Sequence, residues 1–113
     1  MKINLNQNSN FLNIELSEVF HFDNFIEFII NLGKKNADRF FIDGTQLENT
    51  DLSYKERFDI GNTAVIYLDL NAKYVVLWPR RDINYFAISV MKLHGFNIQV
   101  FSNKRHASKW LLG

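Results

Sequence analysis

From about residue 23 to its end, the chain alternates between segments with helical periodicity and short apolar segments typical of β-strands. In order, we expect helix 23–35, strand 39–43, helix 53–68, strand 73–78, helix 79–94, strand 96–101 and helix 103–111. This order places consecutive strands parallel to one another, each pair joined by a crossover helix. The sequence therefore predicts an α/β fold with a mostly parallel sheet and about four helices.

Two further segments complete the predicted sheet. Lys73–Trp78 is a nearly continuous apolar run, which is typical of a central strand buried on both faces. Near the amino terminus, residues 3–7 and 11–16 each alternate between apolar and polar side chains and are separated by a short polar stretch. We therefore expect an N-terminal β-hairpin at one edge of the sheet.

Local signals predict where the helices begin and end. Asp23 is a candidate N-cap for the first helix, and Ser53 with Glu56 fits the S-x-x-E capping box of the second. The third helix is expected to start directly after Pro79 and to end at Gly95. Either Ser102 or Asn103 caps the last helix.

Composition restricts the class of protein. With 113 residues, 47% of them hydrophobic, the chain suits one domain spanning residues 1–113 rather than a disordered segment. It contains no cysteine, which excludes disulfide scaffolds, thiol catalysis and cysteine-ligated metals. No signal peptide is recognisable, and the apolar runs are too short to span a membrane. We expect a cytoplasmic protein.

Two segments resemble a known family. They are FFIDGTQLENTDLSYKERFDIGN and GFNIQVFSNKRHASKWLL, which are similar to the SpoIIAA-like proteins, in the same structural class as STAS domains (sulfate-transporter and anti-sigma-factor-antagonist modules). The shared pattern consists of Asp43, Glu56-Arg57 with Gly61, Gly95, Val100-Phe101, and Ala107 with Trp110-Leu111. The resemblance covers roughly residues 11–113. It implies a βα superhelix and a bacterial, non-catalytic regulatory or protein-interaction module.

The resemblance also implies a possible phosphosite. In antagonist STAS domains a partner kinase phosphorylates the second serine of a D-S-S-G-like turn, and Ser53 of the segment Asp51-Leu52-Ser53-Tyr54 matches that position. Leu52 and Tyr54 depart from the pattern, standing where the family has serine and glycine. The alternative is that Ser53 only caps the helix.

The carboxyl edge of the sheet is where open parallel sheets bind ligands. Asp43, Arg80, Arg81, Ser102 and Asn103 all follow expected strand ends, so we expect them to converge there. Arg57 lies on the inward arc of its helix and would need a partner, for which Asp43 is a candidate. This group predicts either a site for an anion or small polar ligand, or an ion pair with ordinary helix caps.

No signature of catalysis is recognisable. The chain has no G-x-S-x-G, G-x-G-x-x-G or P-loop motif, and its three histidines lack metal-ligand spacing. The sequence predicts a protein that is not an enzyme and uses no cofactor or metal.

Binding partners are indicated by the apolar residues and the charge distribution. An apolar ligand could enter between helices and sheet, or the broadly apolar segment Phe22–Leu32 could form a homodimer. The net charge of +1 divides into about −5 for residues 1–72 and +6 for residues 73–113. This division favours a protein partner over nucleic acid, and no membrane association is expected. The function predicted is a protein-interaction module, with small-molecule or apolar-ligand binding as the alternative.

Overall fold

The computed structural model describes residues 1–113 and contains one five-stranded sheet. Its strands are β1 (Lys2–Gln7), β2 (Leu12–Val19), β3 (Arg39–Glu48), β4 (Lys73–Leu77) and β5 (Asn97–Phe101). They lie side by side in the order in which they occur in the chain. β1 pairs with β2 in antiparallel fashion, and the other neighbours are parallel. The α/β fold with a mostly parallel sheet and an N-terminal hairpin is confirmed.

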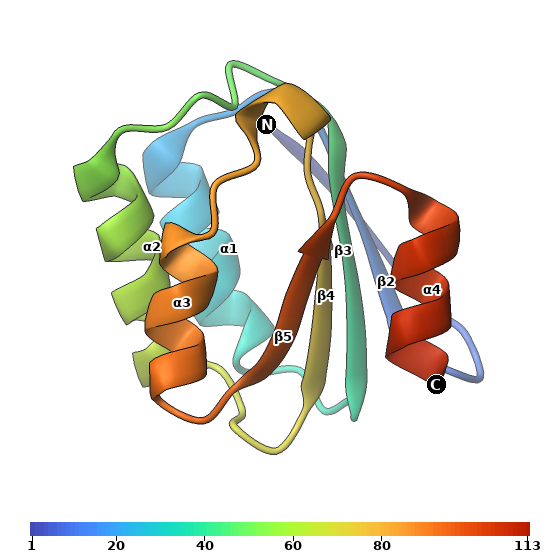
Figure 1. Ribbon diagram of the computed structural model, residues 1–113. Helices are drawn as coiled ribbons and strands as arrows, with labels where there is room; N and C mark the ends of the chain where they lie inside the picture. The colour runs from blue at the N-terminus through green and yellow to red at the C-terminus, as the bar shows by residue number, and fades with distance from the viewer.

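Helices cover both faces of the sheet. The four helices are α1 (Phe22–Leu32), α2 (Tyr54–Tyr67), α3 (Phe86–Leu93) and α4 (Lys104–Leu112). The first three connect successive parallel strands and lie on one face, whereas α4 lies on the other (Figure 1). Because connections between parallel strands share one handedness, strands laid down in one direction bring their crossover helices to the same side. None of the helices combines the length and apolar character that a membrane span requires.

The alternation of side chains along β4 divides the core into two. Tyr74 and Trp78 pack toward α1–α3 in the larger cluster, whereas Val75 and Leu77 pack toward α4 in the smaller one. All four are buried. The expectation of a central strand buried on both faces is confirmed.

Most of the apolar residues of α1 are buried within the chain. Phe25, Phe28, Ile29 and Leu32 are buried against the sheet and neighbouring helices. Phe22, Ile26 and Ile30 are only half-buried, and the homodimer expected through this segment stays a prediction. The N-cap is His21, whose Nδ1 accepts a hydrogen bond from the Asn24 backbone N–H at 3.3 Å, so the expectation of Asp23 was wrong.

β3 extends five residues beyond its expected end at Asp43. Gly44 lies directly under the indole of Trp78, where a Cβ would come within 2.7 Å of two ring carbons. Only glycine lets the strand pass beneath this ring, so Gly44 continues the strand rather than ending it. The strand ends at Glu48.

The third helix is shorter than expected. Arg80–Asp82 form a single 3₁₀ turn, η1, and Ile83 is extended with ψ 127°. α3 starts only at Phe86, whose backbone N–H donates to Asn84 Oδ1 at 2.8 Å. The prediction of a continuous helix after Pro79 was wrong because the Asn84 side chain starts a new helix. Gly95 does follow its end, with φ +89°.

The other predicted caps are present. Ser53 Oγ accepts from the Glu56 N–H at 3.1 Å, and Glu56 Oε1 accepts from the Ser53 N–H at 2.8 Å, which completes the capping box. Asn103 caps α4 by accepting from the His106 N–H at 3.1 Å.

Candidate functional site

The structure separates two residues that the sequence analysis paired. Asp43 Oδ1 accepts hydrogen bonds from the backbone N–H and the hydroxyl of Thr45, at 3.0 and 2.6 Å. Arg57 interacts instead with Leu52 and Asp51. The predicted ion pair between Asp43 and Arg57 is therefore wrong.

The alternation of side chains along β3 explains why Asp43 and Arg57 do not meet. Asp43 lies two residues after Phe41, which packs in the cluster on the α4 side of the sheet. Arg57 belongs to α2, on the opposite side. The sheet itself lies between the two side chains.

An apolar cavity lies on the side of Arg57, between the sheet and helices α1–α3. Its volume is about 110 Å³, and 18 of its 20 lining residues are hydrophobic. α1 contributes Phe25 and Phe28, while the sheet contributes Ile42, Tyr74 and Trp78 among others. The two lining residues outside the hydrophobic set are Arg57 and Asn84.

The one exposed residue of the cavity lining, Asn84, lies at the carboxyl edge of the sheet. Leu52 and Ile83 are half-buried, and Asn84 is exposed. These residues belong to the loops that follow β3 and β4, so the rim is built from two strand-to-helix connections. This edge is where α/β sheets commonly bind ligands.

Arg57 is the one charged side chain in the lining. It is only 8% exposed. Its Nε donates to the Leu52 carbonyl at 3.0 Å, and its Nη2 lies 3.8 Å from Asp51 Oδ1. The Asp51 side chain is 89% exposed. The guanidinium is thus held in place by one backbone carbonyl and paired with an exposed carboxylate, and its terminal nitrogens are in contact with solvent.

Tyr74 contributes the only hydroxyl to the lining. The hydroxyl donates to the Asp69 carbonyl at 2.7 Å. Burial raises the pKa of Tyr74 above the usual tyrosine range, and the negative charge of Asp69 adds to this effect. Tyr74 therefore remains protonated at neutral pH and offers the cavity no base.

A partly buried hydrogen bond joins the two loops of the rim. Thr50 is 1% exposed, and its hydroxyl donates to Asp82 Oδ2 at 2.7 Å. The Trp78 indole N–H also points to the Thr50 carbonyl, at 3.4 Å. These contacts tie the β3–α2 loop to η1 and so fix the shape of the rim. Thr50 and Asp82 could not be identified from the sequence, because no local pattern marks a contact between residues 32 positions apart.

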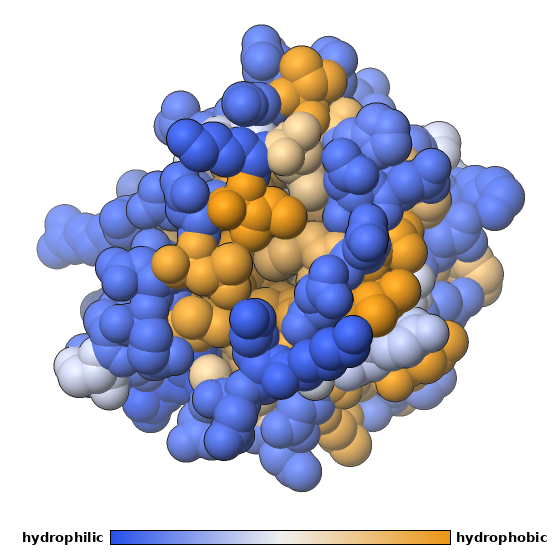
Figure 2. All heavy atoms as spheres, turned by 180° about the vertical axis from the view of Figure 1, so that it is seen from behind, coloured by the Kyte–Doolittle hydropathy of each residue, from blue (hydrophilic) through white to orange (hydrophobic).

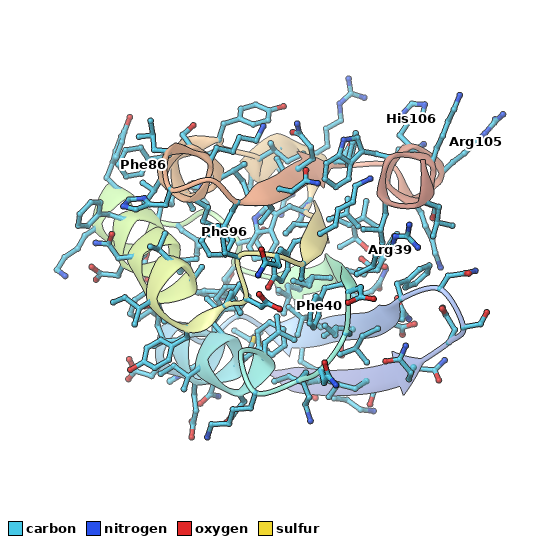
Figure 3. The ribbon with its side chains drawn as sticks, turned by 90° about the horizontal axis from the view of Figure 1, so that it is seen from below. Arg39, Phe40, Phe86, Phe96, Arg105 and His106 are labelled. Carbon is cyan, nitrogen blue, oxygen red and sulfur yellow. The ribbon has the colours of Figure 1, made fainter.

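A second, polar cleft of about 400 Å³ adjoins the cavity and shares Ile83 and Val100 with it. It is also lined by Arg80, Tyr85, Phe101, Ser102, Asn103 and His106. Of the residues expected to converge, Arg80, Ser102 and Asn103 meet here, whereas Asp43 lies elsewhere. Arg81 is exposed and pairs with neighbouring Asp82 at 3.5 Å. Arg105 and His106 project outward from the first turn of α4 (Figure 3).

Ser53, the candidate phosphosite, lines neither the apolar cavity nor the polar cleft. Ser53 is exposed and caps α2, which agrees with its interpretation as a structural cap. No three histidine, cysteine, aspartate or glutamate side chains lie close enough together to hold a metal ion.

Comparison with known protein families and with curated proteins gave no match to this chain. The resemblance to SpoIIAA-like and STAS domains therefore stays a prediction.

Proposed function

We propose that this protein binds a small, largely apolar ligand in the cavity between the sheet and α1–α3, and that it acts by binding rather than by catalysis. The observation that carries the proposal is a cavity of about 110 Å³ with 18 hydrophobic lining residues. Protein interiors are normally packed as densely as organic crystals, and large voids are few. A hollow of this size, whose one exposed lining residue lies at the ligand-binding edge of an α/β sheet, is a suitable ligand site.

The size of the cavity restricts the ligand. An engineered apolar cavity of about 150 Å³ accommodates a benzene molecule, so this one suits an apolar group of roughly four to six carbon atoms. Aromatic walls from Phe25, Phe28 and Trp78 favour compact branched or cyclic groups.

The chemistry of the lining supports binding over catalysis. It contains no carboxylate or histidine, and its only hydroxyl, on Tyr74, is engaged with a backbone carbonyl and stays protonated. General acid–base catalysis needs a group that exchanges protons near neutral pH. Arg57 does not meet this requirement, because guanidinium keeps its proton.

A thermal-shift series tests the proposal. Small molecules that carry a compact apolar group, namely benzene, 3-methylbutanamide and 3-methylbutanoate, are titrated against the wild type, because any ligand of the native state raises the melting temperature by mass action. The control is Ala64→Leu, which fills the cavity from α2. Shifts in the wild type that vanish in the variant would support the proposal. Equal shifts in both proteins, or none in either, would overturn it.

A second candidate function, protein interaction, is favoured by the edge strand β1. Only one side of β1 is paired, with β2, and Leu5 is 47% exposed on it. Figure 2 shows apolar side chains gathered in the middle of the face seen from behind, surrounded by polar ones. An unpaired strand edge readily accepts a further strand. Size-exclusion chromatography with light scattering tests this: a dimer that Leu5→Lys dissociates is expected, and a monomeric wild type contradicts self-association.

A further inference from the structure

We propose that the ligand of the cavity is an anion, a small branched or aromatic carboxylate whose charged group pairs with Arg57. This inference rests on the proposed function and specifies the chemistry of the same site.

Arg57 has unused hydrogen-bonding capacity. A guanidinium carries five N–H donors in a fixed plane. One of them, on Nε, is used by the Leu52 carbonyl. The terminal nitrogens make no protein hydrogen bond, since Asp51 Oδ1 at 3.8 Å from Nη2 lies beyond hydrogen-bond range. Four donors therefore have no partner in the protein, and because no buried side-chain nitrogen lacks a hydrogen-bond partner, the terminal nitrogens are in contact with solvent.

The charge of Arg57 is only partly balanced by the protein, because its one ion-pair partner, Asp51, lies 3.8 Å from Nη2 without a hydrogen bond. Burying a cation is costly unless a counter-charge and hydrogen bonds accompany it. Asp51 compensates little, because its side chain is 89% exposed and the interaction is screened by water. A carboxylate in the cavity would supply both the counter-charge and the two oxygens that a guanidinium accepts side by side.

The second polar residue of the lining points to the same chemistry. Asn84 uses its Oδ1 to accept from the Phe86 N–H, which leaves its amide nitrogen as the free polar group. Both polar residues of the lining therefore offer donors. A ligand headgroup that accepts hydrogen bonds fits them, whereas an ammonium group does not.

The position of Arg57 sets the orientation of the ligand. Arg57 belongs to the first turn of α2 and contacts the loop at the rim, whereas Phe28, Ile29 and Leu32 form the buried wall supplied by α1. The carboxylate would lie at the rim beside Arg57, with the apolar group directed inward.

The experiment compares ligands matched in shape but not in charge. Calorimetric titration of the full chain uses 3-methylbutanoate against 3-methylbutanamide, and benzoate against benzamide. We expect each carboxylate to bind about tenfold or more tightly than its amide at neutral pH, since charge-assisted hydrogen bonds are the stronger ones. The advantage should disappear as the pH falls through the pKa of the ligand's own carboxyl group.

Two variants identify the residue responsible. Arg57→Gln should reduce the carboxylate advantage to about twofold or less, while Arg80→Gln, in the adjoining polar cleft, should leave it unchanged. If Arg57→Gln does not fold, Arg57→Lys takes its place, with a weakened preference expected because lysine lacks the planar fork.

The outcomes separate this inference from the proposed function. Equal binding of acid and amide would overturn the anion inference and leave apolar-ligand binding intact. Loss of the preference in Arg80→Gln but not in Arg57→Gln would assign the anion to the polar cleft and also overturn it. Binding of none of the four compounds would overturn both.

Discussion

Adding one methylene group to the cavity wall should stabilise the protein, and the size of the effect follows from the cavity volume. At about 24 cal/mol per Å³, a cavity of about 110 Å³ corresponds to roughly 2.6 kcal/mol of lost stability. Val76→Ile extends a lining residue of β4 by one methylene, which fills roughly a quarter of that volume. Together with the apolar surface that it removes from water, we expect a gain of about 1 kcal/mol.

The neighbouring residue provides a matched control. Val75 lies on the opposite face of β4, fully buried against α4 with Ala107 and Leu111. Val75→Ile adds the same methylene where there is no space, so we expect a loss of about 1–3 kcal/mol from overpacking.

Urea denaturation of the two variants measures both changes through the transition midpoint at constant m value. Val76→Ile should also raise the melting temperature by roughly 4 °C and weaken ligand binding. If both substitutions shift the midpoint in the same direction and to the same extent, the two faces of β4 do not differ in packing, and the reasoning from the cavity is refuted.

Three further predictions concern caps, packing and pH. Ser53→Ala should cost about 1 kcal/mol in urea denaturation by removing the cap of α2, whereas Ser102→Ala, next to a helix that another residue caps, should cost almost nothing; equal costs would contradict the capping role. Gly44→Ala should destabilise the fold by about 1–3 kcal/mol and alter tryptophan fluorescence, because the new methyl group meets the Trp78 ring; an unchanged spectrum and midpoint would contradict this contact. Burial raises the pKa of Tyr74 in the folded state, so the stabilisation from its neutral form is complete below the unfolded pKa of about 10 and is lost as pH rises above it. The urea midpoint should therefore fall above about pH 10, and less steeply in Tyr74→Phe; identical slopes would contradict the prediction.

Features encoded by neighbouring residues were predictable from the sequence. The capping box of Ser53 and Glu56 depends on a spacing of three residues, and the central strand Lys73–Leu77 on an uninterrupted apolar run. Both are local patterns whose geometry hardly depends on the rest of the molecule. The alternation of helices and strands was sufficient to predict the parallel sheet.

Features that depend on residues far apart in the chain were not predictable from the sequence. A glycine at the end of an apolar segment usually marks the end of a strand. Only the ring of Trp78, 34 residues after Gly44, shows why β3 continues through this glycine. The break between η1 and α3 depends on one side-chain oxygen of Asn84, which a helical pattern does not reveal. Element boundaries are therefore less predictable than element types.

The candidate site was only partly predictable. The inward position of Arg57 was deduced correctly from its helix, but the partner was wrong because the alternation along β3 was not followed from Phe41 to Asp43. That signal was present in the sequence, since side chains two residues apart share a face. The volume of the cavity could not be predicted from the sequence, because it depends on how the 20 lining side chains pack in three dimensions.

The order of the strands in the sheet, which is the same as their order in the chain, affects how the protein folds during synthesis. Each strand pairs with the strand that precedes it, so during synthesis every new strand can join an edge that has already formed. The cavity is different, because its walls extend from Phe25 in α1 to Val100 in β5. A nascent chain can thus assemble most of its sheet while the cavity is still open on one side. The ligand proposed for the cavity would find a complete set of walls only after β5 has joined the sheet.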